Sequence, residues 1–118
     1  MNGWDVRVVG ADGPVVRAAV DIDPAHPVLE GHYPGFPILP GLYLVEYVHS
    51  LVRATRGVRR PVALERVRFA APVYGGDTVD LAAELSEKDG VLRCAATASV
   101  GERTVAQIRL RYATGGVR

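Results

Sequence analysis

Polar and hydrophobic residues alternate along most of the chain, and a period of two is typical of strands with one buried face. In residues 14–22, for example, Val16 and Ala18 flank Arg17. The turn-forming pair Asp12 and Gly13 separates this segment from residues 5–11, so the two segments are predicted to form a hairpin. The same alternation predicts strands within residues 61–73, 78–86, 91–100 and 103–112.

The parity of residues within the later strands assigns their faces. Val67 and Phe69 share one parity, with arginines between and beside them, and both are expected on the buried face. In the last strand Thr104 has the parity of the apolar positions and Val105 the opposite parity. Turns are expected at Asp89-Gly90 and Gly101-Glu102, so consecutive strands in this half of the chain should be antiparallel.

One long helix is predicted between Pro40 and Gly57. Proline suits the first helical position, and glycine suits the left-handed residue that ends a helix. About 16 residues would span roughly 24 Å. Apolar side chains lie nearly all round its axis, which predicts a helix buried on most sides. The expected fold is therefore α+β, a single domain over residues 1–118, with about six mostly antiparallel strands wrapped around one central helix.

Composition adds limits to this expectation. The chain has 118 residues, is 48% hydrophobic and carries a net charge of +1, which suits one compact domain and argues against a dedicated nucleic-acid binder. No apolar run is long enough to span a membrane and no secretory signal is apparent, so a cytoplasmic location is expected. A single cysteine, Cys94, excludes an internal disulfide and is expected to be a small buried strand residue.

Glu46 lies in the most apolar part of the predicted helix. A carboxylate removed from water must be paired, hydrogen-bonded or neutralised, because its desolvation is costly. Two interpretations follow from its position alone. Glu46 is either a structural residue that reaches solvent or an arginine, or an acid poised for catalysis.

The segment before the helix favours the catalytic interpretation. His32 stands in a loop whose prolines and glycines restrict the backbone and allow close approach of other groups. At the helix start Pro40 has no N–H, so Gly41 supplies the first free backbone donor, where the helix dipole favours negative charge. A base, an acid and an oxyanion-binding amide are thus found within 15 residues.

The segment HYPGFPILPGLYLVE, residues 32–46, resembles the signature of the hotdog-fold 3-hydroxyacyl-(acyl-carrier-protein) dehydratases. In that family a histidine precedes an aromatic-Pro-Gly-x-Pro-x-x-Pro-Gly loop, and a glutamate follows fourteen residues after the histidine, the separation of His32 and Glu46 here. VRFAAPVYGGDTVDL and ATASVGERTVAQIRL are also similar to family segments. The resemblance extends over roughly residues 24–112.

The resemblance implies a dimer whose two sheets join, with the histidine of one subunit facing the acid of the other. His32 would remove the α-proton of a 3-hydroxyacyl thioester, Glu46 would protonate or polarise the departing hydroxyl, and the Gly41 amide would bind the thioester carbonyl. The product would be a trans-2-enoyl thioester in fatty acid or polyketide biosynthesis. No metal or redox cofactor is implied, and His26, His32 and His49 lack metal-ligand spacing. The substrate would be carried on the phosphopantetheine of an acyl carrier protein.

Two further groups of residues are candidates for binding. An acyl tunnel would be lined by Tyr33, Phe36, Leu39, Tyr43, Tyr47 and Ser50; the alternative for each residue is packing in the core or at the dimer interface. Arg53, Arg56, Arg59 and Arg60 either form a solvated helix end that complements the dipole or dock an acidic carrier protein.

The chain also departs from the family pattern beside Glu46. Ser50 replaces the usual glutamine four residues after the acid, and Tyr47 and His49 replace smaller residues. A non-catalytic hotdog partner subunit or acyl-binding module is therefore an alternative, and a hotdog thioesterase is a third. The sequence does not determine the acyl chain length or the pathway. It also leaves open whether the dimer is a homodimer or a heterodimer, and how Ser50 affects turnover.

Overall fold

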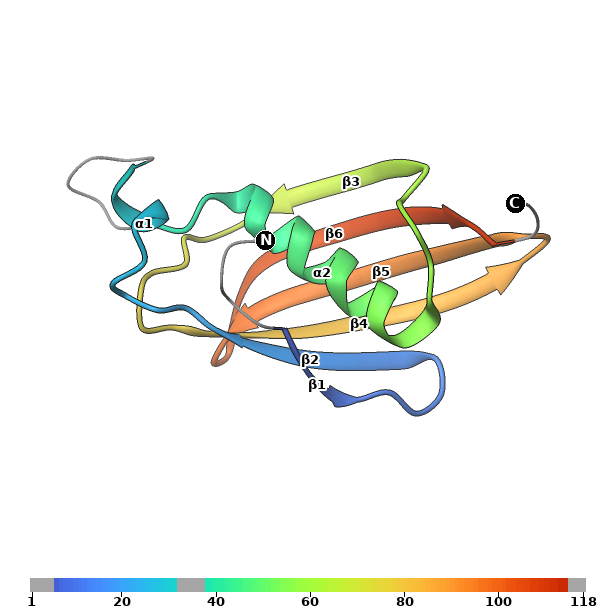
Figure 1. The fold of residues 1–118 in the computed structure, drawn as a ribbon, viewed down its shortest axis with the longest axis horizontal. Coiled ribbons are helices and arrows are strands. Elements are labelled where there is room, and N and C mark those ends of the chain that lie inside the picture. The colour runs from blue at the N-terminus through green and yellow to red at the C-terminus, as the bar shows by residue number, and fades with distance from the viewer. Residues whose placement is uncertain (1–5, 32–37, 115–118) are drawn as a thin grey trace.

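The structure is a computed structural model that describes residues 6–31 and 38–114. Its described part forms one six-stranded sheet and two helices (Figure 1). In chain order the elements are β1 (Arg7–Gly10), β2 (Val15–Asp21), α1 (Val28–Gly31), α2 (Gly41–Arg56), β3 (Ala63–Phe69), β4 (Thr78–Lys88), β5 (Val91–Val100) and β6 (Arg103–Ala113).

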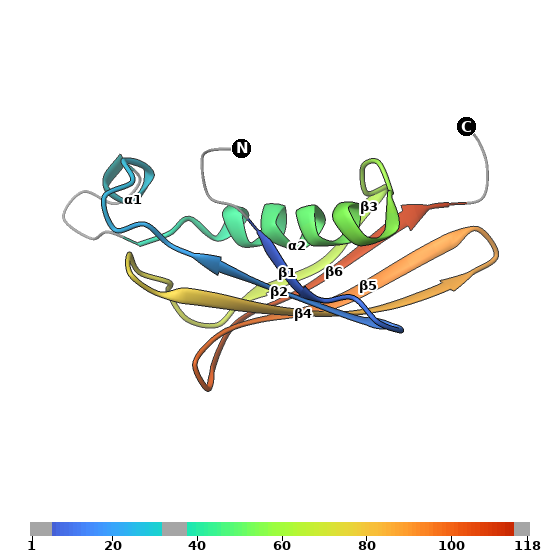
Figure 2. The ribbon, with the colours of Figure 1, turned by 60° about the horizontal axis from the view of Figure 1, so that its bottom comes forward.

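The strands follow the order β1-β2-β4-β5-β6-β3, and all the pairs are antiparallel. The predicted turns are present: Asp89 and Gly90 have φ values of 55° and 77°, as a tight hairpin of type I′ requires. Strands β1 and β3 are the two edges of the sheet. Helix α2 lies across one face of the sheet (Figure 2), which confirms the α+β prediction.

The ends of α2 agree closely with the sequence prediction. Pro40 is the N-cap, one position before its predicted place, with extended backbone (φ −60°, ψ 137°). Gly57 is left-handed (φ 69°), and its N–H donates to the Arg53 carbonyl at 2.9 Å. Proline cannot donate a backbone hydrogen bond and glycine accepts positive φ, so these residues define the helix limits.

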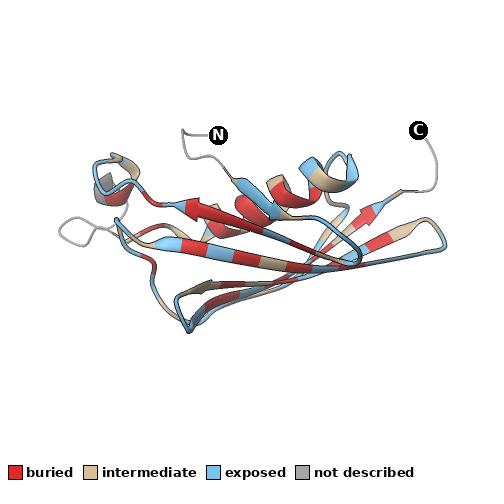
Figure 3. Ribbon diagram, turned by 90° about the horizontal axis from the view of Figure 1, so that it is seen from below, coloured by how far each residue is buried: buried red, intermediate tan, exposed pale blue. Residues whose placement is uncertain are grey.

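The predicted burial of α2 on most sides is wrong for the single chain. Only one stripe is buried against the sheet, and it consists of Leu44, Tyr47, Val48, Leu51 and Val52. The opposite face is open and includes Leu42, which is 69% exposed, and Glu46. Buried and exposed bands also alternate along the strands, as Figure 3 shows. The sheet therefore curls under the helix and leaves one helix face uncovered.

Two predictions of strand faces are also wrong. Val105 is fully buried and Thr104 is exposed, because Ala98 pairs with Ala106 while Ser99 pairs with Thr104, so Val105 is an extra residue in a bulge. Phe69 is 49% exposed instead of buried. It ends the edge strand β3, beside α2 rather than under it.

The short helix α1 was not predicted. It is one turn long, and His26 starts it by accepting the backbone N–H of Val28 at Nδ1 (3.2 Å) and that of Leu29 at its carbonyl (3.1 Å). Leu29 is fully buried and fixes this turn to the core. A single turn has too few residues for a helical period to be recognised in the sequence.

Candidate active site

The beginning of α2 presents free backbone donors. The first backbone hydrogen bond at this end runs from the Tyr43 N–H to the Pro40 carbonyl at 3.0 Å. The N–H groups of Gly41 and Leu42 precede it and, as at any helix start, have no partner within the helix. The helix dipole makes this end electropositive, so it suits an oxygen that gains negative charge.

A pocket of about 350 Å³ opens beside these donors. Leu39, Gly41, Leu44 and Phe69 line one part of it, and residues 70–73 complete the wall. A hydrogen bond of 2.8 Å from the Leu39 N–H to the Val73 carbonyl joins the two sides. The wall is largely apolar, so the pocket combines acyl-compatible surface with a backbone donor.

Glycine at position 41 is required by the ring of Phe69. A β-carbon added to Gly41 would lie 2.7 Å from Cζ of Phe69 and 2.8 Å from a neighbouring ring carbon. Such distances are well inside van der Waals contact. The absence of a side chain therefore lets the ring close against the helix start and form one wall of the pocket.

Glu46 lies on the open face of α2, one helical turn after Leu42. Its side chain is exposed in the single chain, so the desolvation that motivated the catalytic interpretation is absent here. The sequence left open whether Glu46 reaches solvent or is an acid poised for catalysis. In the single chain its side chain reaches solvent. Burial of Glu46 would require a second molecule over this face of the helix.

The other half of the predicted catalytic pair falls outside the described residues. His32 lies in the segment 32–37, as do the candidate tunnel residues Tyr33 and Phe36. The pairing of His32 with Glu46, and the place of the two aromatic residues, stay predictions.

The remaining tunnel candidates have different positions. Leu39 lines the pocket beside Gly41. Tyr47 is fully buried in the core, and its ring packs edge-to-face on that of Tyr43 with 6.4 Å between centroids. Tyr43 and Ser50 are half-buried on the side of α2 next to the open face. Of these residues the structure brings only Leu39 to the pocket.

A contact near Glu46 was not predicted from the sequence. His49 Nδ1 lies 2.9 Å from the hydroxyl of Tyr112, and the two rings stack with centroids 5.8 Å apart. Burial lowers the pKa of His49, while the charge of Glu46 acts in the opposite direction. The spacing of Glu46 and His49 on one helix was visible in the sequence, but a partner 63 residues away was not.

The chain is similar to known dehydratases over most of its length. Residues 10–108 match the model of the ApeI-like family, described as ApeI dehydratase. The chain belongs to this family. The 3-hydroxyacyl-[acyl-carrier-protein] dehydratase FabZ of Thermus thermophilus is 32% identical, over 93% of this chain and 84% of that protein. FabZ of Thermotoga maritima is 30% identical, over 80% of this chain and 74% of that protein.

Solved structures confirm the hotdog fold of this ApeI-like chain. The dehydratase heterocomplex ApeI:P from Xenorhabdus doucetiae gives a TM-score of 0.76 at 20% identity, over 92% of this chain and 98% of that one. The PaaI protein of the E. coli phenylacetic acid degradation operon gives a TM-score of 0.73 at 16% identity, over 92% of this chain and 82% of that one. The fold and the family predicted from residues 32–46 are thus both confirmed.

The arginines proposed for carrier docking lie at the far end of α2 from Gly41. Arg53 and Arg56 are in its last turn, and Arg59 and Arg60 follow it; all four are exposed. Arg56 also donates to the carbonyl of Gly13 at 3.1 Å, which ties the helix end to the β1–β2 turn. The other three arginines remain candidates for a partner.

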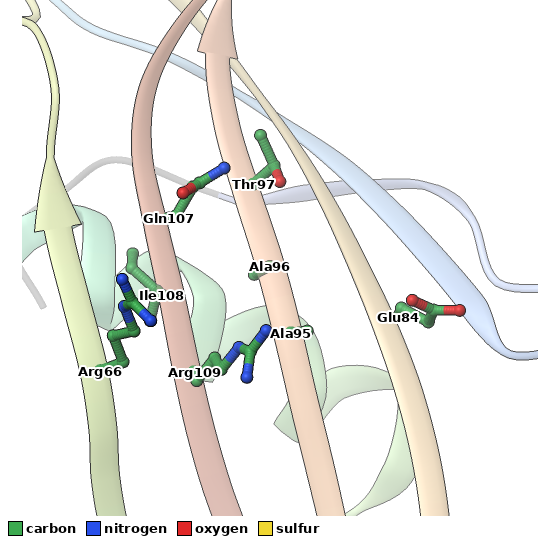
Figure 4. Close-up of a pocket in the computed structure, with 8 residues that line it drawn as sticks. All are labelled: Arg66, Glu84, Ala95, Ala96, Thr97, Gln107, Ile108 and Arg109. Carbon is green, nitrogen blue, oxygen red and sulfur yellow. The ribbon is translucent and has the colours of Figure 1, made fainter.

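A second pocket, of about 320 Å³, lies on the face of the sheet opposite α2. Figure 4 shows its side chains projecting from the strands, with α2 behind them. Arg66 and Arg109 are directly paired across β3 and β6 there, beside Gln107 and Thr97. None of the residues predicted for catalysis lines it.

No helix of the described residues is both long and apolar enough to cross a membrane.

Proposed function

We propose that this chain dehydrates a 3-hydroxyacyl thioester, presented by an acyl carrier protein, to the trans-2-enoyl thioester in fatty acid or polyketide biosynthesis. The observation that carries the proposal is the apolar pocket at the start of α2, where the Gly41 N–H is available beside it. Membership of the ApeI-like dehydratase family and the similarity to FabZ support this choice of reaction.

In the proposed reaction, His32 takes a proton from C2 of the substrate. The electron pair moves toward the thioester oxygen, and the Gly41 N–H and the helix dipole stabilise that developing charge. Glu46 gives a proton to the hydroxyl on C3, which leaves as water while the C2–C3 double bond forms. Each positioned acid or base typically contributes about 10²- to 10⁴-fold to the rate. The proposed reaction uses no metal or redox cofactor.

The proposal places a second hotdog subunit over the open face of α2. Leu42 and Glu46 are neighbours on that face, and Leu64 and Phe69 expose apolar surface along the edge strand β3. A joined sheet would pair that edge, and the exposed side chain of Leu42 on the open face of α2 would be covered at the same time. The partner's copy of His32 would then complete the site around Glu46.

A non-catalytic role as a partner subunit is the second candidate. The similarity to a dehydratase heterocomplex favours it, because a subunit of such an assembly can support a site without performing the chemistry. The short hydroxyl of Ser50 beside Glu46 is consistent with this alternative.

Purified protein supplied with carrier-bound 3-hydroxyacyl thioesters of several chain lengths tests the two candidates. We expect enoyl thioester from the wild type and at least about a 100-fold slower reaction from His32→Ala. A folded dimer that yields no enoyl product with any chain length refutes the dehydratase proposal. Equal pathway output from wild type and His32→Ala supports the partner role, and release of free thiol instead of enoyl product would indicate a thioesterase.

A further inference from the structure

The ring of His49 is held by the core of the protein. His49 is half-buried on α2, and its Nδ1 lies 2.9 Å from the hydroxyl of Tyr112 on β6. The two rings are nearly parallel, at 17°, and Tyr112 is fully buried. A hydrogen bond and a stacking contact to a buried side chain together restrict both χ angles of the histidine.

The hydrogen bond also selects a tautomer. Burial raises the pKa of the Tyr112 phenol, so its O–H stays protonated and, being buried, needs an acceptor. Neutral imidazole offers that acceptor at Nδ1 when the proton is on Nε2. Burial lowers the pKa of His49, which favours this neutral form. The ring nitrogen left as a donor is therefore Nε2.

Glu46 is the carboxylate nearest in sequence to this donor. Residues three apart on a helix are neighbours on its surface, and the charge of Glu46 acts on both His49 and Tyr112. Ser50, four residues after Glu46 on the same helix, has only a short hydroxyl. An imidazole reaches farther than that hydroxyl and has a fixed direction.

We propose that His49 is the positioning residue for Glu46: Tyr112 occupies Nδ1, and the Nε2–H of the same ring would donate to one carboxyl oxygen of Glu46 once a second subunit covers the open face of α2. The other carboxyl oxygen is then free to deliver the proton to the departing hydroxyl. This inference rests on the proposed function, in which Glu46 is the acid.

The arrangement is sensitive to acid. Protonation of His49 turns Nδ1 into a donor, so the Tyr112 hydroxyl loses its acceptor. The charged groups that act on His49 are Glu46, which raises its pKa, and Arg53 and Arg60, which lower it. Cys94, the other titratable group acting on Tyr112, is buried and stays a neutral thiol. The working state of the pair is therefore the one above the pKa of His49.

Two substitutions separate positioning from packing. Asparagine at position 49 places an amide near the position of Nδ1, so His49→Asn can still bond Tyr112 but has no group at Nε2. Glutamine places its amide near Nε2, so His49→Gln can reach Glu46. We expect His49→Asn to lower kcat by about 10- to 100-fold at unchanged KM, and His49→Gln to recover part of the loss. His49→Asn with wild-type kcat would overturn the proposal.

A second readout does not depend on activity. The chain has three histidines, so the imidazole proton signals in an NMR titration are few, and the one absent from His49→Asn belongs to His49. Tyr112→Phe should raise the pKa of His49, because the neutral ring loses its hydrogen-bond donor. Glu46→Gln should lower it. Unchanged values in both variants would overturn the proposal even if the chain is a dehydratase, whereas shifted values in a chain without dehydratase activity would refute only the proposed function.

Discussion

The ring of Phe69 lies so close to Gly41 that the space for a β-carbon at position 41 does not exist. Gly41→Ala should therefore displace the ring or the start of α2, where the proposed carbonyl donor is located. We expect kcat to fall by about 10- to 100-fold, since displacements on the order of 1 Å have effects of this size. Enoyl formation under saturating substrate is the measurement.

The double variant Gly41→Ala, Phe69→Ala provides the control. Without the ring, the added methyl group has room, so the second substitution should restore part of the activity that the first one removes. Purely additive losses in this double-mutant cycle would show that the ring and the glycine do not act on each other.

Leu42 tests the proposed cover over the open face of α2. A charge in an apolar subunit interface is costly, so Leu42→Glu should shift the protein from dimer to monomer in sedimentation experiments. Val9→Glu is the matched control, because Val9 is 64% exposed against 69% for Leu42 and lies on the other edge strand, β1. Both variants should stay folded by circular dichroism. Equal dimer content in the two variants would exclude this face from the interface.

Cys94 should make the fold less stable at high pH. Burial raises the pKa of its thiol to about 12, from an ordinary value of 9.0. The folded state then retains a proton that the unfolded state loses, so stability is complete below pH 9 and falls as the pH rises above it. The free energy of unfolding should decrease by about 1 to 2 kcal/mol between pH 8 and pH 10 in urea titrations.

Cys94→Ala separates the thiol from the buried tyrosines. The pKa values of Tyr47 and Tyr112 are also raised by burial, so part of the decrease should remain in the variant. A thiol reagent at pH 8 should leave the folded wild type unmodified and label one cysteine in urea. A decrease of equal size in wild type and Cys94→Ala would contradict the assignment.

The arginines after α2 give a prediction about the carrier protein. Reversing Arg59 and Arg60 to glutamate should weaken binding of an acidic carrier, with the largest effect at low salt, because both charges are exposed and well hydrated. Arg17 and Arg68, exposed on the strands β2 and β3, provide a control with the same change in net charge. Carrier affinity that is unchanged by the first pair, or reduced equally by both pairs, would remove the helix end as a docking site.

Much of the fold follows from local patterns in the sequence. Strand alternation, the Asp89-Gly90 turn and the limits at Pro40 and Gly57 each depend on a few neighbouring residues, and the structure confirms them. The bulge at Val105 was missed because it depends on how β6 pairs with β5, and parity within one strand contains no information about its neighbour.

In the candidate site too, local features could be predicted from the sequence and long-range contacts could not. The place of Gly41 at the helix start could be predicted, since a helix start after a proline is a local property. Exposure of Glu46 could not, because a hydrophobic helix face looks the same in sequence whether a sheet or another chain covers it. The bond between His49 and Tyr112 was also beyond prediction, because its two ends are joined only by the folded sheet.

In the proposed enzyme, each active site takes His32 from one chain and Glu46 from another. This sharing can be tested by mixing His32→Ala with Glu46→Gln, since neither variant has a complete site alone, while each mixed dimer has one intact site of two. Refolding equal amounts together should restore about one quarter of wild-type enoyl formation, because half of the dimers are mixed under random two-fold pairing. Mixed dimers seen by native mass spectrometry without recovered activity would contradict the shared site.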